Sequence, residues 1–329
     1  MAHHARALAT TLGGTAAFGA AVLGAAVVEA HAFTTHHVDV PVLAPGSAPI
    51  RVLHISDIHL QARQRDKMAF LRRLADERPD LVVSTGDHIS QGRAIEELVE
   101  ALTPLRELPG VFVLGSNDFE APVWRNPAAY LWSTTSDLEN PARVALPTEH
   151  LRERLQGLGW VDLDDAAVRV RAAGCTLDLR GTGDPHIGLD HYERVAGPPA
   201  ADAAVTIGVT HAPYRRVLDA MVDDGVGLVL AGHTHGGQVC LPNGRAIITN
   251  CDIDPGRASG LHRWAHAGHE GWLHVSNGMG TSPFAPAVLP ALGDPAAVRA
   301  RLLRPDPPLP RRRPGARGAI RYRRPRGLD

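Results

Sequence analysis

Short apolar runs recur along the chain, and each ends abruptly in polar residues. They are rich in Val, Ile and Leu, and few of them alternate with polar positions, which predicts β-strands covered on both faces. Five of these runs lead directly into side chains that can bind metal: RVLHIS (51–56), DLVVSTG (80–86), GVFVLGS (110–116), VTIGVT (205–210) and GLVLAG (227–232).

Amphipathic helices are predicted between several of these strands. Apolar residues recur at helical spacing in 66–77, in 94–108 and, over a shorter length, in 214–224. The segment 161–181 predicts two strands around a turn at Ala173 and Gly174. Alternating strands and helices predict a layered α/β domain with partly parallel sheets. Because ligands lie outside the carboxyl ends of such strands, we expect the five runs to present their polar residues at one rim.

The two ends of the chain depart from this pattern. Residues 7–28 carry no charge and would span about 33 Å as a helix, enough to cross a bilayer core. Arg6 precedes this run and Glu29 follows it, which favours a cytoplasmic N-terminus. We therefore expect residues 1–30 to be a single-pass membrane anchor with the rest of the chain outside the cytoplasm. A cleaved signal peptide and a secreted product are the alternative, because Ala30–Ala32 resembles a cleavage site.

The remaining sequence divides into a linker, one domain and a tail. We expect residues 31–50 to be the linker, residues 51–289 to form a single α/β domain and residues 290–329, rich in Pro and Arg, to be disordered. The formal net charge is −1, and the tail carries much of the positive charge. An acidic domain argues against nucleic acid as a specific partner, while the oligomeric state stays open.

The strand ends carry seven imidazole, carboxylate and amide side chains and no thiolate. This donor set suits divalent ions such as Mn, Fe, Zn or Co. Seven ligands exceed one tetrahedral site but suit two ions that share a carboxylate, an arrangement that lowers the pKa of a bridging water and serves phosphoryl displacement. The seven are Asp57, His59, Asp87, Asn117, His211, His233 and His235. His54 lies inside a predicted strand and is expected to be a hydrogen-bonded core histidine.

The polar ends also form ordered motifs. DIH (57–59), GDH (86–88), GSND (115–118), THAP (210–213) and GHTHGGQ (232–238), in this order and spacing, resemble the five motifs of the calcineurin-like metallophosphoesterase family. The likeness covers residues 51 to about 286, and the last motif is similar to that of bacterial, membrane-anchored phosphoesterases. The resemblance implies a four-layer α/β sandwich, with two mixed β-sheets flanked by helices.

The resemblance further implies a dinuclear metal centre bridged by Asp87. It divides the other ligands between two divalent ions: Asp57, His59 and His235 at the first, and Asn117, His211 and His233 at the second. A hydroxide between the ions would attack phosphorus in line.

Two features differ from the family pattern. The third motif usually reads G-N-H, and its histidine can protonate the leaving group, whereas here Asp118 stands at that position. Because nearby cations favour a charged carboxylate, we expect Asp118 to orient a ligand or a cationic substrate group. Water, His186 or His88 would then protonate the leaving group. The family domain also usually closes with a strand after 280–286, and we expect this strand to be missing or altered.

These observations predict a dimetal-dependent phosphoester hydrolase, either a phosphodiesterase or a phosphatase, acting on a lipid-linked or envelope phosphate. Two alternatives stay open. One is a non-catalytic metal-binding scaffold on the same fold, and the other is a hydrolase of a different bond. No metal ligand of the family pattern is lost, which favours the enzyme.

Overall fold

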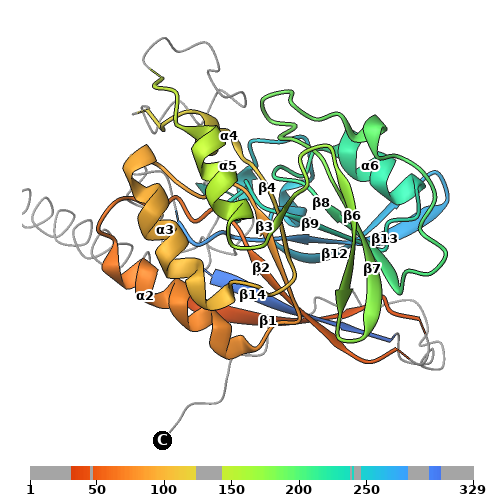
Figure 1. Ribbon diagram of the computed structural model, residues 1–329. Coiled ribbons are helices and arrows are strands. Elements are labelled where there is room, and N and C mark those ends of the chain that lie inside the picture. Colours follow the sequence, from red (N-terminus) through yellow and green to blue (C-terminus); the bar gives the residue numbers. More distant parts are fainter. Residues whose placement is uncertain are drawn as a thin grey trace, which may run out of the picture.

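The computed structural model describes residues 31–44, 47–123, 143–237, 239–240, 246–280 and 296–304 (Figure 1). Within these ranges, the strands form two six-stranded mixed sheets and one small two-stranded sheet. The first sheet has the order β1 (Thr34–Pro41), β14 (Ala296–Leu303), β2 (Ile50–Ile55), β3 (Leu81–Thr85), β4 (Gly110–Val113) and β5 (Val161–Asp162). Strands β2 to β5 are parallel, and β14 runs antiparallel to β2.

The second sheet has the order β12 (Gly260–His266), β13 (His269–Val275), β9 (Leu228–Ala231), β8 (Val205–Val209), β7 (Cys175–Gly181) and β6 (Ala167–Ala172). Strands β13, β9, β8 and β7 are parallel, and antiparallel strands close both edges. The hairpin of β6 and β7 turns at Ala173 and Gly174, as predicted, and both residues have positive φ. The small sheet pairs β10 (Val239–Cys240) with β11 (Ala246–Ile248).

Helices cover the outer face of each sheet (Figure 1). The α-helices are α2 (Arg65–Arg73), α3 (Ile95–Leu102), α4 (Ser116–Phe119), α5 (Thr148–Gln156) and α6 (Arg215–Asp223). Short 3₁₀ turns lie at Leu74–Glu77, Gly92–Ala94, Thr103–Leu105, Tyr192–Arg194 and Pro255–Arg257. Apolar side chains of α2, α3 and α5 pack on the first sheet, and those of α6 pack on the second.

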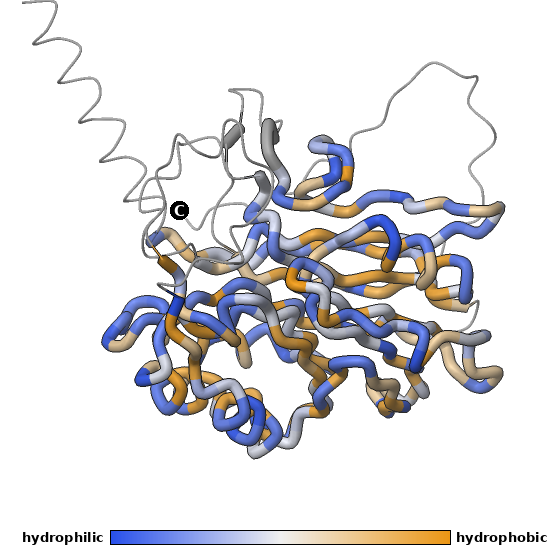
Figure 2. Tube along the Cα trace, turned by 90° about the horizontal axis from the view of Figure 1, so that it is seen from above, coloured by the Kyte–Doolittle hydropathy of each residue, from blue (hydrophilic) through white to orange (hydrophobic). Residues whose placement is uncertain are grey.

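A third apolar cluster fills the space between the sheets, with Val52, Val83, Ile207 and Leu230 among its members. Figure 2 shows the same distribution, with strands inside the molecule mostly apolar and many peripheral turns hydrophilic. Helices, sheet, sheet and helix thus form four layers. The expected class, an α/β sandwich of two mixed sheets flanked by helices, is confirmed.

Two expected boundaries were wrong. Strand β1 lies within the segment expected to be a linker, and β14 lies within the segment expected to be a tail and supplies the closing strand expected to be missing or altered. Val298 and Leu302 of β14 are buried between the sheets. Arg301 of β14 forms an ion pair at 2.8 Å with Asp39 of β1. The alternating apolar and arginine positions therefore belong to a strand that pairs with β1 on one side and β2 on the other.

The chain termini fall outside this description. The expected anchor at 1–30 and the remaining tail at 305–329 lie outside the described residues. Among the residues that are described, no helix is long and apolar enough to cross a membrane.

Candidate metal centre

Loops at one edge of the two sheets carry the residues of the five motifs. Each loop follows the carboxyl end of a parallel strand: β2, β3, β4, β8 or β9. The loops after β2 and β3 stay paired beyond the sheet, because the N–H groups of Asp57 and His59 donate to the carbonyls of Gly86 and Asp87 at 3.0 and 2.9 Å. The motifs therefore meet at one edge of the two sheets, as expected.

Several of these residues adopt a backbone conformation that non-glycine residues rarely use. A positive φ costs on the order of 1 kcal/mol or more for such residues and persists where the surroundings enforce it. The residues concerned are Asp57, His59, Asp87, His233 and His235, with φ between 46° and 69°. Strain concentrated on five of the seven expected ligands indicates a site shaped for function.

The first group of side chains consists of Asp57, His59 and His235. Their ligand atoms lie within 4.8 Å of one another. The Nε2 atoms of His59 and His235 are 3.3 Å apart, and His235 Nε2 lies 3.6 Å from Asp57 Oδ1. Three donor atoms therefore converge on one point, as the first ion of the predicted pair requires.

The second group lies beside the first. His211 Nε2 lies 3.3 Å from His233 Nδ1, and Asp57, Asp87 and His211 form a further set of ligand atoms within 4.8 Å. Asn117 lies on the same loop edge, and its side-chain amide donates to Asp87 Oδ2 at 2.7 Å. The structure thus brings all seven expected ligands together.

Asp87 lies between the two groups. Its Oδ2 is 3.4 Å from His59 Nε2, and its Oδ1 is 3.6 Å from His211 Nε2. The carboxylate presents one oxygen to each group, which is the arrangement that a bridging ligand needs.

The protonation of the histidines suits metal binding. Burial lowers the pKa of His59 to about 4 and that of His233 well below its ordinary value, so both rings are neutral at pH 7 and keep a lone pair. Burial also lowers the pKa of His211, but the carboxylates of Asp87 and Asp184 outweigh it and raise this pKa to about 10. A positive charge is therefore favoured at this point, and a divalent ion would take the place of that proton.

Two glycines allow the loops to approach this closely. A Cβ at Gly232 would collide with Ser56 Oγ and with the carboxylate of Asp57, and a Cβ at Gly115 would collide with Asp87. Any larger residue would displace a ligand. The donor set, the shared carboxylate and these close approaches fit two divalent ions.

Asp118 and His88 contact each other and the loops that carry the expected ligands. Both are fully buried. The carboxylate of Asp118 accepts backbone N–H groups from His88 at 2.7 Å, Ile89 at 3.2 Å and Gly115 at 3.1 Å. The ring of His88 contacts Asp118 Oδ2 at 2.8 Å through Nδ1 and Ser84 Oγ at 2.8 Å through Nε2. With these partners, Asp118 ties the Asp87 loop to the Asn117 loop, and neither residue is placed to touch substrate.

His186 lies beside the second group. Its ring centroid is 4.3 Å from that of His233, and its Nδ1 lies 3.1 Å from the hydroxyl of Tyr214. The side chain is partly exposed. Of the three residues expected to take part in catalysis, His186 is the one that lies at the edge of the metal centre.

Asp184 is a residue that sequence reasoning missed. It is buried, its Oδ1 accepts the backbone N–H of His186 at 2.8 Å, and its Oδ2 has no hydrogen-bond partner. Burial raises the pKa of its carboxyl to about 7. The signal was present in the sequence, because Gly-Asp-Pro-His follows β7 as the other motifs follow their strands.

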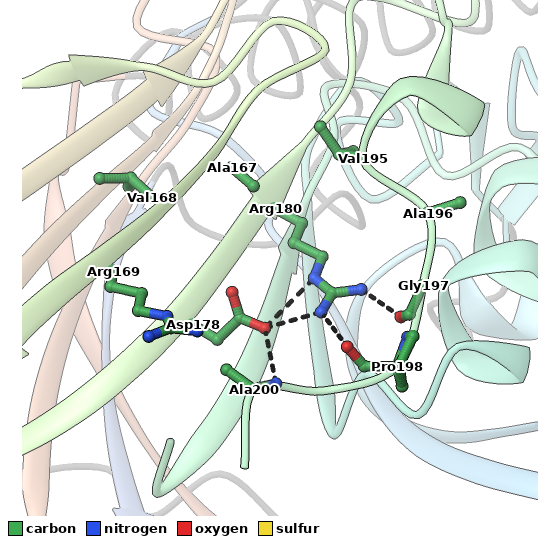
Figure 3. A pocket seen from close by; sticks show the side chains of 10 residues that line it. All are labelled: Ala167, Val168, Arg169, Asp178, Arg180, Val195, Ala196, Gly197, Pro198 and Ala200. Atoms are coloured by element: carbon green, nitrogen blue, oxygen red, sulfur yellow. Dashed lines mark hydrogen bonds and ion pairs between the residues drawn. The ribbon is translucent and has the colours of Figure 1, made fainter. Parts of the chain in front are cut away.

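A separate cavity of about 390 Å³ lies along β6 and β7 (Figure 3). Its Arg180 is already paired with Asp178 at 2.8 Å and also donates to the carbonyls of Gly197 and Pro198. These charges satisfy one another, and none of the seven expected ligands is among the residues that line the cavity.

Comparison with known proteins agrees with this geometry. The model of the family described as calcineurin-like phosphoesterase matches residues 50–237. The chain belongs to this family.

Relatives come from both bacteria and animals. The chain is 28% identical over 199 residues to "Uncharacterized protein YpbG" of Bacillus subtilis, covering 59% of this chain and 64% of that protein. It is 30% identical over 238 residues to the bovine "Transmembrane protein with metallophosphoesterase domain", covering 67% of this chain and 48% of the relative. It is 25% identical over 207 residues to "Phosphodiesterase YaeI" of Escherichia coli, covering 60% and 64%. The match spans less than two thirds of each of these relatives.

Family membership supports a phosphoesterase in general terms, and the family's fold implies divalent metals. The bacterial membrane-anchored type stays a prediction.

Proposed function

We propose that this protein is a dimetal phosphoester hydrolase. The observation that carries the proposal is the position of Asp87, whose two carboxylate oxygens face His59 of one ligand group and His211 of the other. Asp57, His59 and His235 would hold the first ion, Asn117, His211 and His233 the second, and Asp87 both. Two such ions, when bound, supply a water of lowered pKa and neutralise charge on the phosphoryl oxygens.

The protein's own groups orient the ligands. Thr85 O accepts a hydrogen bond from His211 Nδ1 at 2.7 Å, which leaves Nε2 of that ring to face Asp87. The backbone N–H of His233 donates to both oxygens of Asp57 at 3.1 and 3.0 Å. These contacts fix the directions of the donor atoms before any ion binds.

We assign the leaving-group proton to His186. Its partly exposed ring lies against His233, while Asp184 holds its backbone and Tyr214 contacts its Nδ1. Asp118 cannot serve, because its oxygens are taken by backbone N–H groups. The loss of histidine from the third motif is thus offset by a histidine from the segment after β7.

The substrate class is a phosphodiester or a phosphomonoester. The complete ligand set favours turnover over a scaffold role. The test is hydrolysis of bis(p-nitrophenyl) phosphate and p-nitrophenyl phosphate by protein stripped with EDTA and reloaded with Mn²⁺. We expect activity only after reloading. Stable Mn²⁺ binding without hydrolysis would support the scaffold alternative, and cleavage of p-nitrophenyl acetate alone would indicate a different bond.

We further propose a location at the cell membrane, with residues 1–30 as anchor, the domain outside the cytoplasm and a lipid-linked or envelope phosphate as substrate. The uncharged run of residues 7–28 supports this proposal. Fractionation of cells that express the full chain tests it. Full-length protein with Met1 intact in the soluble fraction would contradict the anchor, and a soluble product beginning near Phe33 would support the secreted alternative.

A further inference from the structure

A buried series of hydrogen bonds extends from Asp57 away from the metal centre and crosses from one sheet to the other. Ser56 Oγ donates to Asp57 Oδ2. Thr85 Oγ1 lies 2.6 Å from Ser56 Oγ, His54 Nε2 lies 3.0 Å from Thr85 Oγ1, and His54 Nδ1 lies 3.1 Å from His274 Nδ1. None of these five side chains is more than 1% exposed. We call Asp57, Ser56, Thr85, His54 and His274 the Asp57 network.

The hydrogen bonds of the Asp57 network all run in one direction. Ser56 donates its single hydroxyl hydrogen to Asp57 Oδ2, so its Oγ accepts from the hydroxyl of Thr85. Thr85 then accepts from His54 Nε2–H. A neutral imidazole has one N–H, so His54 Nδ1 must accept, and His274 Nδ1–H donates to it.

The protonation of the two rings agrees with this assignment. Burial lowers the pKa of His54 well below its ordinary value and that of His274 to about 3. Both imidazoles are therefore neutral at pH 7, with one N–H each. The two rings meet edge to face, with centroids 5.3 Å apart.

Thr85 serves the two ligand groups with different atoms. Its hydroxyl belongs to the Asp57 network, whereas its carbonyl oxygen accepts from His211 Nδ1 at 2.7 Å. Asp57 Oδ2 accepts a hydrogen bond from Ser56 Oγ, whereas Asp57 Oδ1 lies 3.6 Å from His235 Nε2. Removal of the hydroxyl alone should therefore disturb one ligand group and spare the other.

We propose that Thr85, His54 and His274 are positioning residues that set the orientation of Asp57 and thereby the affinity for the ion held by Asp57, His59 and His235. This inference rests on the two-ion site of the proposed function. Residues hydrogen-bonded to metal ligands typically change metal affinity about 10- to 100-fold when replaced, although here the contact runs through Ser56.

The first test compares Thr85→Val with the wild type by calorimetric titration of the metal-free full chain with Mn²⁺. Valine keeps the shape and the carbonyl of Thr85 but lacks the hydroxyl. We expect one of two binding events to weaken about 10-fold, with the other changed less than about 2-fold. Thr206→Val is the matched control, since Thr206 is a buried strand threonine whose hydroxyl bonds Asp178, a residue of the separate cavity.

The second test uses the far end of the Asp57 network. His274→Leu removes the donor to His54, whereas His274→Asn keeps an N–H near the position of Nδ1. We expect leucine to weaken the same binding event and asparagine to restore most of the affinity. Far-UV circular dichroism verifies that each compared variant is folded, and a leucine variant that fails to fold leaves Thr85→Val and His274→Asn to decide.

The outcomes separate this inference from the proposed function. Unchanged Mn²⁺ affinity in folded Thr85→Val, or an equal loss in Thr206→Val, would overturn the role of the Asp57 network. Two bound Mn²⁺ ions without phosphoester hydrolysis by the wild type would overturn the function and leave the network intact. Failure of the wild type to bind Mn²⁺ would overturn both.

Discussion

Asp118 is buried and holds two loops together, whereas His186 is partly exposed and is the proposed proton donor. Asp118 accepts three backbone N–H groups and so ties the loops that carry Asp87 and Asn117. His186 lies against His233 with a partly exposed ring, which is why we propose it as the proton donor. A proton donor can thus come from a different segment than the third motif.

This assignment predicts a dependence on the leaving group. His186→Ala should lower kcat on alkyl phosphoesters, whose alcohols leave poorly, by roughly 10²-fold or more, and on p-nitrophenyl esters by much less, because general acid catalysis matters most for poor leaving groups. His191→Ala is the matched control, since His191 lies five positions further along the same segment, is exposed and pairs with Glu193. Equal losses on both substrate types would show that His186 acts only in binding or packing.

Single-residue roles were predictable where a motif stood at a strand end. All seven side chains that the structure brings together were named from sequence as candidate ligands, because Asp, His and Asn after buried strands are expected to meet at the carboxyl edge of a parallel sheet. The positions of Asp118 and His88 were not predictable. The position of Asp118 depends on how the four-residue helix α4 directs its side chains, and that of His88 depends on its contacts with Asp118 and Ser84. The order of residues in the sequence does not specify either direction.

At the level of elements, continuous apolar runs identified β2, β3, β4, β8 and β9. No run predicted β1, β12 or β13, and β14, in which apolar residues alternate with Arg299 and Arg301, lies in the segment expected to be a tail. The two arginines pair with Glu77 and Asp39, and these partners are distant in sequence. A segment that contains charged residues can thus form a strand when its charges pair with residues distant in sequence. The pattern of residues within the segment does not show such partners.

The packing of the two sheets also explains how the Asp57 network reaches Asp57 through the core. Ile50, Val52 and His54 alternate on the face of β2 that meets the second sheet, so His54 lies where apolar side chains otherwise fill the core. The sequence predicted a hydrogen-bonded core histidine at this position, which is confirmed. Its partner His274 was not predicted, because the contact depends on how the two sheets are packed together.

On the scale of the whole molecule, the two sheets place their carboxyl edges together, so that neither sheet alone holds a complete site. Asp57, His59, Asp87 and Asn117 come from loops of the first sheet, whereas His211, His233 and His235 come from loops of the second. Metal binding should therefore be coupled to the packing of the two halves. The shared carboxylate of Asp87 is the point where the two ligand groups meet.

We propose that the buried carboxylate of Asp87 bridges two ions that together drive phosphoester hydrolysis. The most direct measurement is the metal content and the bis(p-nitrophenyl) phosphate turnover of Asp87→Asn beside the wild type. Asp178→Asn is the control, since Asp178 is a buried carboxylate paired with Arg180 away from the site. We expect two ions and activity in the wild type and the control. Asp87→Asn should lose tightly bound metal and should lose more activity than the ~100-fold typical of changes beyond the direct ligands. Wild-type turnover by Asp87→Asn with two ions bound would show that the Asp87 carboxylate is not the bridging ligand.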